Sequence, residues 1–549
     1  MKNTRKRKIK TDALRLAAAA LCLFILALPL SACSRVRQQL TPTAEPQATQ
    51  QPPATEVPAP VSGGRLRMPM PENISIGNIK HDPLLVSTED ALRIYSLVFE
   101  PLIAVDESNS LIPCLASRWS ASQHEANCWQ VYLREGVTWH DGAKLTADDV
   151  IYSWQELGYK GRDGYYAKSL ELIESITKLD DMTVIVMTSE PGLMCLYGLN
   201  FPITRSGAKP FTGTGPYRVT SYGDSRISLS VNTDWWDRPP YIEKIDFYPR
   251  DSNETALASY SAGQLDFVPT AKLAAGQYAE TGVTAVRDYM TQGMETLLFN
   301  HRRSKLANAD LRRAIALGIN RSRLITNVYM NHARSCDVPV PPDSWLYNSG
   351  GEQINYDPAS AGSLLDGLGY ALRDDGIRYF GSRPLELTLL VGVSQDNTIR
   401  SDAASAIAKQ LGQLGITVEI VTASQEQTPQ GSEFMIALRG GEWDIALVGF
   451  NLSRSNDLSP YLTLRGQNNY GGYTGGAFDD LLREAAAAPD EESLRAAYYA
   501  IQDEFVSELP FIVLYFRLNS LVCKADLLGI ETLREPVLLR NIKNWYLPQ

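Results

Sequence analysis

The chain has 549 residues, of which 44% are hydrophobic and 21% charged, and its formal net charge is −10 at pH 7. A chain of this length exceeds what one hydrophobic core supports, so we expect several domain-sized units. Without the first 32 residues, which carry a net +6, the remainder has a charge of −16, and such an acidic body is repelled by nucleic acids and anionic lipid surfaces.

Residues 1–32 have the parts of a signal peptide. A basic segment precedes the apolar run Leu16–Leu30, which at about 15 residues is short for a membrane-spanning helix. The run ends in "LSAC", which resembles a bacterial lipobox and implies cleavage before Cys33 and acylation of that cysteine. An uncleaved signal anchor with an incidental cysteine is the alternative.

Residues 33–64 are rich in Pro, Gln, Thr and Ala and almost free of large apolar side chains. Such a segment cannot bury enough apolar surface to offset the entropy lost on ordering, so we predict a disordered tether. A lipid on Cys33 followed by a tether predicts an extracytoplasmic body, anchored to the cell membrane but folded outside it.

Residues 131–154 hold many charged side chains, to which we assign structural roles. Residues 131–139 alternate as in a strand, and His140–Gly142 is typical of a turn. Thr146 and Asp149 have the spacing of a helix-capping box. A catalytic or metal-binding role for His140, Asp141 and Asp149 is the alternative. Four tryptophans in and near this stretch are interpreted as packing residues, with a stacking platform as the alternative: Trp119, Trp129, Trp139 and Trp154.

Strand and helix patterns alternate along the rest of the body, which indicates an α/β fold. Residues 226–232 and 242–249 alternate like strands, and residues 309–325 have apolar side chains at helical spacing. Residues 401–421 have the pattern of a helix, a glycine break and a strand. Residues 491–516 have the pattern of a long helix, a proline stop and a strand.

The usual motifs of catalysis and metal binding are absent from the sequence. No CxxC, CxxH, HExxH, GxSxG or P-loop pattern occurs, and "GTGPYR" lacks the third glycine of a dinucleotide-binding loop. We therefore predict no catalytic residue, no metal site and no cofactor. Cys114 and Cys128 could form a disulfide outside the cell, or they could remain isolated buried thiols.

Several motifs follow one another in a fixed order through the body. They are "LVFEPLIAVDESNSLIPCLASRWS", "WQVYLREGVTWHDGAKLTADDVIYSW", "GTGPYRV", "ALASYSAGQLDFV", "LLFNHRRSKLANADLRRAIALGINRSRLI", "YDPASAGSLLDGLGY" and "YGGYTGGAFDDLLREA". Together they resemble the extracytoplasmic solute-binding proteins of the dipeptide, oligopeptide and nickel class, solute-binding family 5 of ABC importers. The resemblance extends from about Gly64 to the C-terminus.

The resemblance implies an α/β fold, a two-lobed periplasmic-binding-protein-like clamp of type II in its large cluster C form. Lobe I would consist of residues 65–90, 205–297 and 518–549. An extra subdomain of lobe I would comprise residues 91–204, and lobe II residues 298–517. A solute held between the lobes would stabilise the closed state and be passed to an ABC permease with its ATPase. A monomer is expected.

The resemblance also directs attention to Trp443–Leu462 as a wall of the cleft. Peptide binders of the family carry an Asp shortly after an aromatic residue there, and it pairs with the α-amine of the ligand. Aligning Phe450 with that aromatic places Ser453 at the acidic position, and Asp457 is the nearest carboxylate. Either Asp457 substitutes for the missing Asp, or the ligand has no free amine at that end. The candidate ligand-binding residues are Phe450, Asn451, Leu452, Ser453, Arg454 and Asp457.

Arg454 has two interpretations: it could meet a carboxylate or phosphate of the ligand, or it could be a solvated loop charge. A peptide is the expected ligand, and an oligosaccharide, a nickel chelate or another solute are alternatives. An anchored extracellular hydrolase and a solute sensor on the same fold are the alternative functions.

Overall fold

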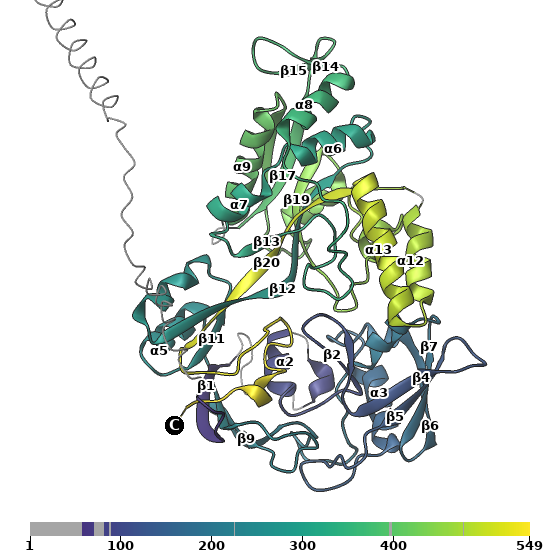
Figure 1. Ribbon diagram of the computed structural model, residues 1–549, viewed down its shortest axis with the longest axis vertical. Coiled ribbons are helices and arrows are strands. Elements are labelled where there is room, and N and C mark those ends of the chain that lie inside the picture. Colours follow the sequence, from purple (N-terminus) through teal and green to yellow (C-terminus); the bar gives the residue numbers. More distant parts are fainter. Residues whose placement is uncertain are drawn as a thin grey trace, which may run out of the picture. The chain divides into compact units, whose positions relative to one another are not determined.

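The computed structural model describes residues 58–70, 82–86, 89–223, 225–394, 398–475 and 477–548. The predicted signal peptide, Cys33 and most of the predicted tether lie outside the described residues. Pro58–Gln549 form one compact unit, and its elements are labelled in Figure 1. Within the described part of the chain, no helix is both long and apolar enough to cross a membrane.

A four-stranded sheet lies in the segments that we predict to form lobe I, and the names lobe I, subdomain and lobe II refer below to the predicted residue ranges. Its order is β1 (Gly63–Pro69), β10 (Ile242–Tyr248), β9 (Arg226–Val231) and β8 (Tyr217–Gly223), with β1 parallel to β10 and the other pairs antiparallel. Side chains of this sheet share a buried core with α2 (Glu89–Tyr95) and with the C-terminal tail. The first and last segments of the described chain therefore pack together in one lobe.

The subdomain contains a four-stranded antiparallel sheet of order β4-β5-β7-β6. Its elements are β4 (Ala116–Ala121), β5 (Cys128–Leu133), β6 (Ile173–Asp180), β7 (Thr183–Thr188), α3 (Ala147–Lys160) and α4 (Ser169–Leu172), with the hairpin β2 (Ile103–Val105) and β3 (Leu111–Pro113) and the 3-10 turn η3 (Leu193–Leu199). The 3-10 turn η2 (Pro83–Leu85), which precedes the predicted subdomain, packs against α3. Trp129 and Trp139 are buried in its core, and Trp119 and Trp154 pack against that core. This confirms the packing interpretation of the four tryptophans.

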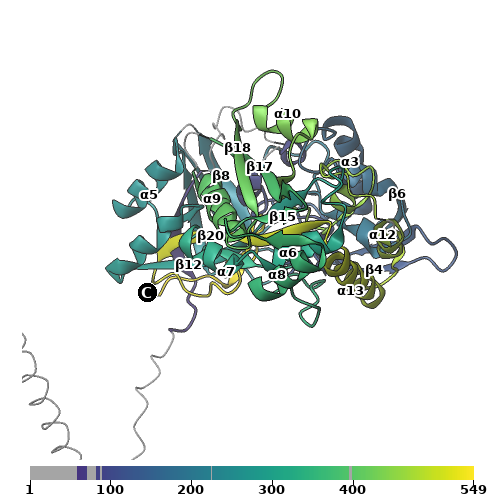
Figure 2. The ribbon, with the colours of Figure 1, turned by 90° about the horizontal axis from the view of Figure 1, so that it is seen from above.

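The central sheet has seven strands in the order β11-β20-β12-β19-β17-β18, with β13 paired to β20. The strands are β11 (Phe267–Thr270), β12 (Thr284–Phe299), β13 (Ala333–Ser335), β17 (Glu386–Val393), β18 (Thr417–Ser424), β19 (Ile445–Asn451) and β20 (Phe511–Lys524). Because β17 lies between β18 and β19 and is parallel to both, the connecting helices α9 (Ile399–Gly412) and α10 (Glu433–Gly440) cover opposite faces of this part of the sheet (Figure 2).

The remaining elements surround these sheets. They are α5 (Asn253–Ser261) and the 3-10 turns η4 (Leu273–Thr281) and η5 (Ile542–Asn544) in lobe I, and α6 (Ala309–Leu317), α7 (Arg321–Asn327), α8 (Pro358–Gly367), α11 (Ser459–Leu462), α12 (Ala477–Ala487), α13 (Glu491–Glu508) and the small sheet β14 (Tyr370–Leu372), β15 (Arg378–Phe380) and β16 (Arg383–Pro384) in lobe II.

Two strands run through both lobes. β12 has 16 residues and β20 has 14, and they pair antiparallel from Thr284↔Lys524 in lobe I to Leu298↔Phe511 in lobe II (Figure 1). Their register shifts between Met290 and Met294, so a bulge interrupts the pairing midway. The predicted boundaries 297/298 and 517/518 both fall inside these continuous strands.

Local predictions were confirmed where the pattern was regular. The strands over 226–232 and 242–249 correspond to β9 and β10, and the long helix with its proline stop corresponds to α13 followed by β20. The helix, glycine break and strand over 401–421 correspond to α9, Gly415 with a φ of 82°, and β18.

Two predicted elements were too long. The strand over 131–139 ends at Leu133, because Gly136 takes a φ of 78° and turns the chain. The helix over 309–325 is two helices, α6 and α7. Gly318 ends the first, and the Asn320 side chain caps the second by accepting a hydrogen bond from Arg323 N at 2.9 Å.

The turn-and-cap interpretation of residues 140–149 was confirmed. Asp141 Oδ1 accepts from Ala143 N at 3.2 Å, and Asp149 Oδ2 accepts from Thr146 N at 2.9 Å and from Trp139 Nε1 at 3.3 Å. The five cysteines of the described chain are free, so Cys114 and Cys128 form no disulfide in this structure.

The double role of Asp149 gives a test of the fold. We expect Asp149→Ala to lower the free energy of unfolding by about 1–3 kcal/mol, because it removes the cap of α3 and leaves the buried Trp139 N–H without a partner. Asp148→Ala is the matched control, since this neighbouring side chain is 72% exposed and its ion pair contributes less than about 1 kcal/mol. Urea unfolding of both variants measures the difference, and equal losses would contradict the capping role.

Candidate functional site

Two adjoining cavities lie between the lobes, and we call them the cleft cavities. The first has a volume of about 730 Å³ and is bordered by the crossing strands, which is our name for β12 and β20. Its lining from lobe I and the subdomain includes Arg93, Tyr165, Ala271, Leu273 and Glu535, and its lining from lobe II and the crossing strands includes Glu295, Tyr329, His332, Arg400, Asn451 and Arg517. Residues from chain segments far apart in the sequence thus meet around one hollow.

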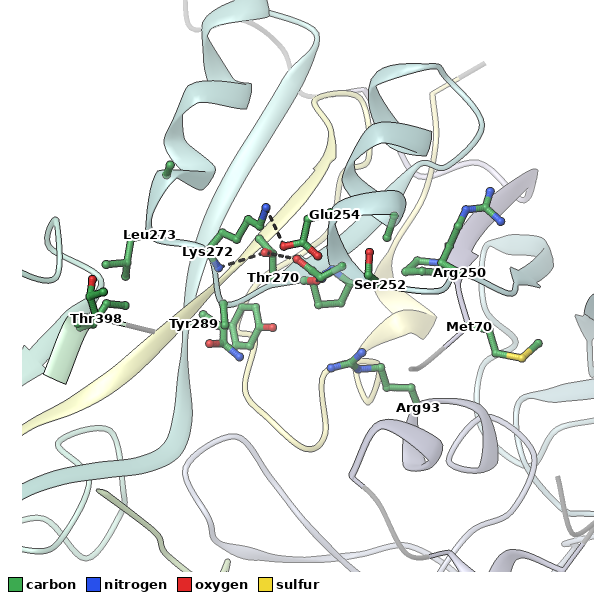
Figure 3. Close-up of a pocket in the computed structure, with 18 residues that line it drawn as sticks. Met70, Arg93, Arg250, Ser252, Glu254, Thr270, Lys272, Leu273, Tyr289 and Thr398 are labelled. Atoms are coloured by element: carbon green, nitrogen blue, oxygen red, sulfur yellow. Dashed lines mark hydrogen bonds and ion pairs between the residues drawn. The ribbon is translucent and has the colours of Figure 1, made fainter. Parts of the chain in front are cut away.

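The second cleft cavity has a volume of about 680 Å³ and shares Arg93, Ala271, Leu273, Ile399 and Asn519 with the first. It extends to the start of α5 (Figure 3), where Lys272 pairs with Glu254 at 2.9 Å. Figure 3 shows Thr398 of lobe II on one side and Arg93 and Met70 of lobe I on the other. The cleft cavities form a space of mixed polar and apolar lining that is large enough for an extended small ligand.

The lobe II wall carries a buried carboxylate held by two arginines. Glu295 of β12 is 2% exposed and accepts from Arg400 Nη2 at 2.8 Å and Arg400 Nε at 3.2 Å. Arg517 Nε lies 3.5 Å from the same carboxylate, and Arg517 Nη2 donates to Asn451 Oδ1 at 3.2 Å. Two guanidinium groups against one carboxylate leave one positive charge on this wall. The wall therefore favours an anionic group of a ligand.

Glycines allow these arginines to approach the strands closely. A Cβ atom at Gly293 would lie 2.4 Å from Arg517 Nη2, and one at Gly449 would lie 2.2 Å from Arg400 Nη2. Any larger residue at either position would displace a guanidinium group. The sequence thus has glycine at the two positions where a side chain would collide with the arginines that bind Glu295.

The lobe I wall contains a second ion pair. Glu535 of the C-terminal tail accepts from Arg93 Nη2 of α2 at 2.7 Å and from the Tyr289 hydroxyl of β12 at 3.3 Å. Burial raises the pKa of Tyr289 well above its ordinary value, with the Glu535 charge adding to this, so Tyr289 stays a neutral donor. The Arg93–Glu535 pair is therefore electrically balanced, unlike the cluster of Glu295, Arg400 and Arg517.

A serine, a histidine and an aspartate meet at the edge of the cleft, and their geometry differs from that of a catalytic triad. Ser520 Oγ donates to Asp288 Oδ1 at 2.7 Å. His332 Nδ1 lies 3.3 Å from Asp288 Oδ1 and 3.3 Å from Ser520 Oγ. A triad needs the serine and the carboxylate on opposite ring nitrogens, whereas here both meet Nδ1. This cluster gives no support to the hydrolase alternative.

A smaller cavity of about 260 Å³, which we call the inner cavity, lies beside the cleft, and Tyr165 lines both. Its wall contains Glu100, which is 5% exposed and accepts from Thr214 Oγ1 at 2.8 Å, Trp236 Nε1 at 3.0 Å and Trp235 Nε1 at 3.1 Å. Burial raises the pKa of Glu100 to about 7, although these hydrogen bonds oppose the rise.

The structure separates the six predicted ligand-binding residues. Asn451 lines the first cleft cavity and Arg454 lines the inner cavity. Phe450 and Leu452 are buried, and the Phe450 ring packs edge-on to Tyr461 with centroids 5.0 Å apart. Ser453 Oγ accepts from Asp457 N at 3.1 Å, which closes the loop between β19 and α11.

The carboxylate of Asp457 already has partners within the chain. Its Oδ1 accepts from Ser459 N at 3.0 Å, and its Oδ2 lies 3.8 Å from Lys168 Nζ. The side chain is 22% exposed and lines neither of the cleft cavities nor the inner cavity. An amine of a ligand would have to compete with Lys168 for this group.

The charged cleft residues Glu295, Arg400 and Arg517 were missed from the sequence. No motif contains all three, and only the pairing of β12 with β19 and β20 and the placement of α9 bring them together. One signal was present: Glu295 is the single acidic residue in the apolar run "MTQGMETLLF". A lone charge in a buried strand needs a partner and so marks a candidate site.

Comparison with known proteins identifies the family. Residues 110–472 match the model of the bacterial extracellular solute-binding proteins, family 5. The oligopeptide-binding protein AppA of Bacillus subtilis is 23% identical over 509 residues, covering 86% of this chain and 91% of that protein. The di/tripeptide-binding protein 2 of Pseudomonas aeruginosa is 26% identical over 451 residues, covering 74% and 81%.

Solved structures agree in fold. The structure of NikZ from Campylobacter jejuni in complex with Ni(L-His) superposes with a TM-score of 0.64 at 20% identity and covers 89% of this chain and all of that one. The chain belongs to the bacterial extracellular solute-binding proteins of family 5, which work with ABC transporters. The predicted family and the predicted two-lobed α/β clamp are thereby confirmed.

The raised pKa of Glu100 predicts a pH dependence of stability. Because the folded protein binds this proton more tightly than the unfolded chain, the Glu100 contribution is fully present below about pH 4.5 and is lost as pH rises to about 7. We expect wild type to lose on the order of 3 kcal/mol relative to Glu100→Gln across this window. Urea unfolding at stepped pH measures the difference.

The exposed Glu135→Gln is the control, and its profile should parallel that of wild type. If wild type and Glu100→Gln keep a constant difference from pH 4.5 to 7, Glu100 does not carry the proton assigned to it.

Proposed function

We propose that this protein is a lipid-anchored extracellular binding protein that captures a peptide between its lobes and delivers it, unaltered, to the permease of an ABC importer. The observation that carries the proposal is the pair of cleft cavities, which are lined from both lobes by residues on or beside two continuous strands. A ligand that contacts both walls stabilises the closed arrangement by its difference in affinity for the two states.

The names of relatives support a peptide as the ligand. AppA is an oligopeptide-binding protein, and the Pseudomonas protein binds di- and tripeptides by name. The NikZ structure holds a nickel complex of histidine on the same fold, so a metal chelate remains the second candidate. Unpaired positive charge on the Glu295, Arg400 and Arg517 wall suits a carboxylate in either ligand.

Within this proposal, the segment from Phe450 to Asp457 borders the ligand. Asn451 and Arg454 are its members with direct access to a cavity. Peptide binding by the main chain, as an added strand, would leave side chains in roomy and hydrated pockets. The mixed polar and apolar lining and the size of the cleft cavities are compatible with this mode.

Recovery of intact peptide tests the proposal. We expect the purified protein, incubated with a defined mixture of di- to pentapeptides, to retain peptides at one per chain and to release them uncleaved on denaturation. Native mass spectrometry followed by sequencing of the released material measures both. Cleavage products would support the hydrolase alternative, and retention of nickel–histidine but of no peptide would support the chelate.

Lipid anchoring is tested by Cys33→Ser. Removing the thiol that would be acylated should move the protein from the membrane fraction to the soluble fraction and remove a lipid-sized mass from its N-terminal peptide. Cys336→Ser is the control, because this buried thiol lies in the folded body. A Cys33→Ser protein that stays in the membrane fraction would favour the uncleaved signal anchor.

A further inference from the structure

The inner cavity is built for an apolar group. Its wall consists largely of aromatic and aliphatic side chains, among them Tyr95, Phe99, Tyr166, Trp235, Trp236 and Leu539. Lobe I, its subdomain and the C-terminal tail contribute these residues. At about 260 Å³ the cavity accommodates a side-chain-sized group, and through Tyr165 it adjoins the cleft.

Most charges in this wall are already satisfied. Arg540 pairs with Glu107 through two contacts, at 2.9 and 3.2 Å, and Lys543 pairs with Asp237 at 2.5 Å. Glu100 accepts from two indole N–H groups, a threonine hydroxyl and the Cys114 thiol, so donors of the protein already occupy its oxygens. These charged groups have partners within the protein, so none of them is assigned to a ligand.

Arg454 is the exception. It comes from lobe II, on the loop after β19, and enters the inner cavity. Its Nη1 donates to Asn200 Oδ1 at 3.2 Å and its Nη2 to the Val105 carbonyl at 2.6 Å, and its buried Nε has no partner among the described residues. Both partners are neutral, and no carboxylate of the described chain forms an ion pair with Arg454.

A half-buried guanidinium without a counterion has lost part of its hydration, and an anion that reaches it gains a charge-assisted hydrogen bond. Burial lowers the pKa of Arg454, and the nearby Arg540 and Arg534, although each is paired with a carboxylate, lower it further. An anionic ligand group here would therefore meet a cation held in place by two hydrogen bonds, next to an apolar hollow.

We propose that the inner cavity recognises a carboxylate attached to an apolar or aromatic group, with the carboxylate on Arg454 and the apolar group against the aromatic wall. In the peptide form of the proposed function, on which this inference rests, the occupant is the C-terminal residue of the bound peptide. A free apolar carboxylic acid has the same chemistry. Because Arg454 belongs to lobe II and the aromatic wall to lobe I, the occupant links the two lobes.

The proposal assigns the ligand's carboxylate, and not its amine, to the loop after β19. This accounts for the absence of an acidic residue at position 453 and for the engagement of Asp457 with Lys168. Amidation of the ligand's C-terminus should then weaken binding, whereas acetylation of its N-terminus should not act through this site.

The experiment compares acids with their amides on three proteins. The probes are an Xaa-Ala-Phe tripeptide mixture, its C-terminal amide, 3-phenylpropionate and 3-phenylpropionamide. The proteins are wild type, Arg454→Gln and the control Arg439→Gln, which changes an exposed arginine of α10. Affinities come from competition measured by native mass spectrometry, and thermal melts verify that each variant is folded.

We expect wild type and Arg439→Gln to prefer the acid over the amide by more than tenfold, as a charge-assisted hydrogen bond implies. Arg454→Gln should reduce that preference below threefold while its affinity for the amide stays within threefold of wild type. Arg454→Lys should keep part of the preference, because it retains the charge without the planar fork.

Each other outcome is decisive. Equal binding of peptide acid and amide by wild type overturns the inference and leaves the peptide function intact. Equal weakening of acid and amide by Arg454→Gln also overturns it, since Arg454 would then act only as a contact between lobes. Binding of 3-phenylpropionate with the expected Arg454 dependence, but of no peptide, keeps the carboxylate site and contradicts the peptide function. Binding of none of the probes contradicts both.

Discussion

The strands β12 and β20 carry the chain between the lobes, and their pairing breaks midway at a bulge between Met290 and Met294. Gln292 lies in that break. Its side chain accepts from Arg534 Nη2 of the C-terminal tail at 3.2 Å and lies 3.5 Å from Asn109 Oδ1 of the subdomain. Asn109 in turn donates to Asn456 Oδ1 of lobe II at 3.3 Å. β12 and β20 are the covalent connection between the lobes, so in the proposed function any movement of the lobes would bend the chain at this bulge.

The same strands position the charges that face a ligand. β12 places Tyr289 toward lobe I and Glu295 toward lobe II, and β20 supplies Arg517 beside Glu295. The Arg93–Glu535 pair is balanced, whereas the cluster of Glu295, Arg400 and Arg517 keeps a positive charge. Arg454, also from lobe II, brings a second cation without a carboxylate partner to the inner cavity. Lobe II thus carries these two groups that favour an anion, and in the proposed function a ligand gains most when both lobes surround it.

The sequence predicted what local chemistry determines. The alternation of apolar and polar residues predicted β9 and β10, and a proline and a glycine predicted where α13 and α9 end. Turn and capping patterns predicted the structural roles of His140, Asp141 and Asp149. Local chemistry also explains two errors: Gly136 and Gly318 each interrupt an element that the hydrophobic pattern alone would continue. The family and the clamp fold followed from the order of motifs, each of which is weak by itself.

The candidate site was only partly accessible from the sequence. Asn451 and Arg454, which line cavities, were proposed from the sequence because they end or follow β19, the strand that the family resemblance singles out. The cluster of Glu295, Arg400 and Arg517 depends on strand pairings between segments more than 100 residues apart, and no local pattern encodes such pairings. Likewise, Lys168 as the partner of Asp457 belongs to another domain-sized part of the chain. Ion pairs between residues far apart in the sequence cannot be predicted before the fold is known.

The most direct test is small-angle X-ray scattering of the purified protein with and without a saturating peptide that mass spectrometry shows to remain intact. A hinged binding protein predicts a smaller radius of gyration and a shorter maximum dimension in the bound state, with both values returning when the peptide is removed. Saturation with peptide and no change in either dimension would contradict closure of the two lobes around a ligand.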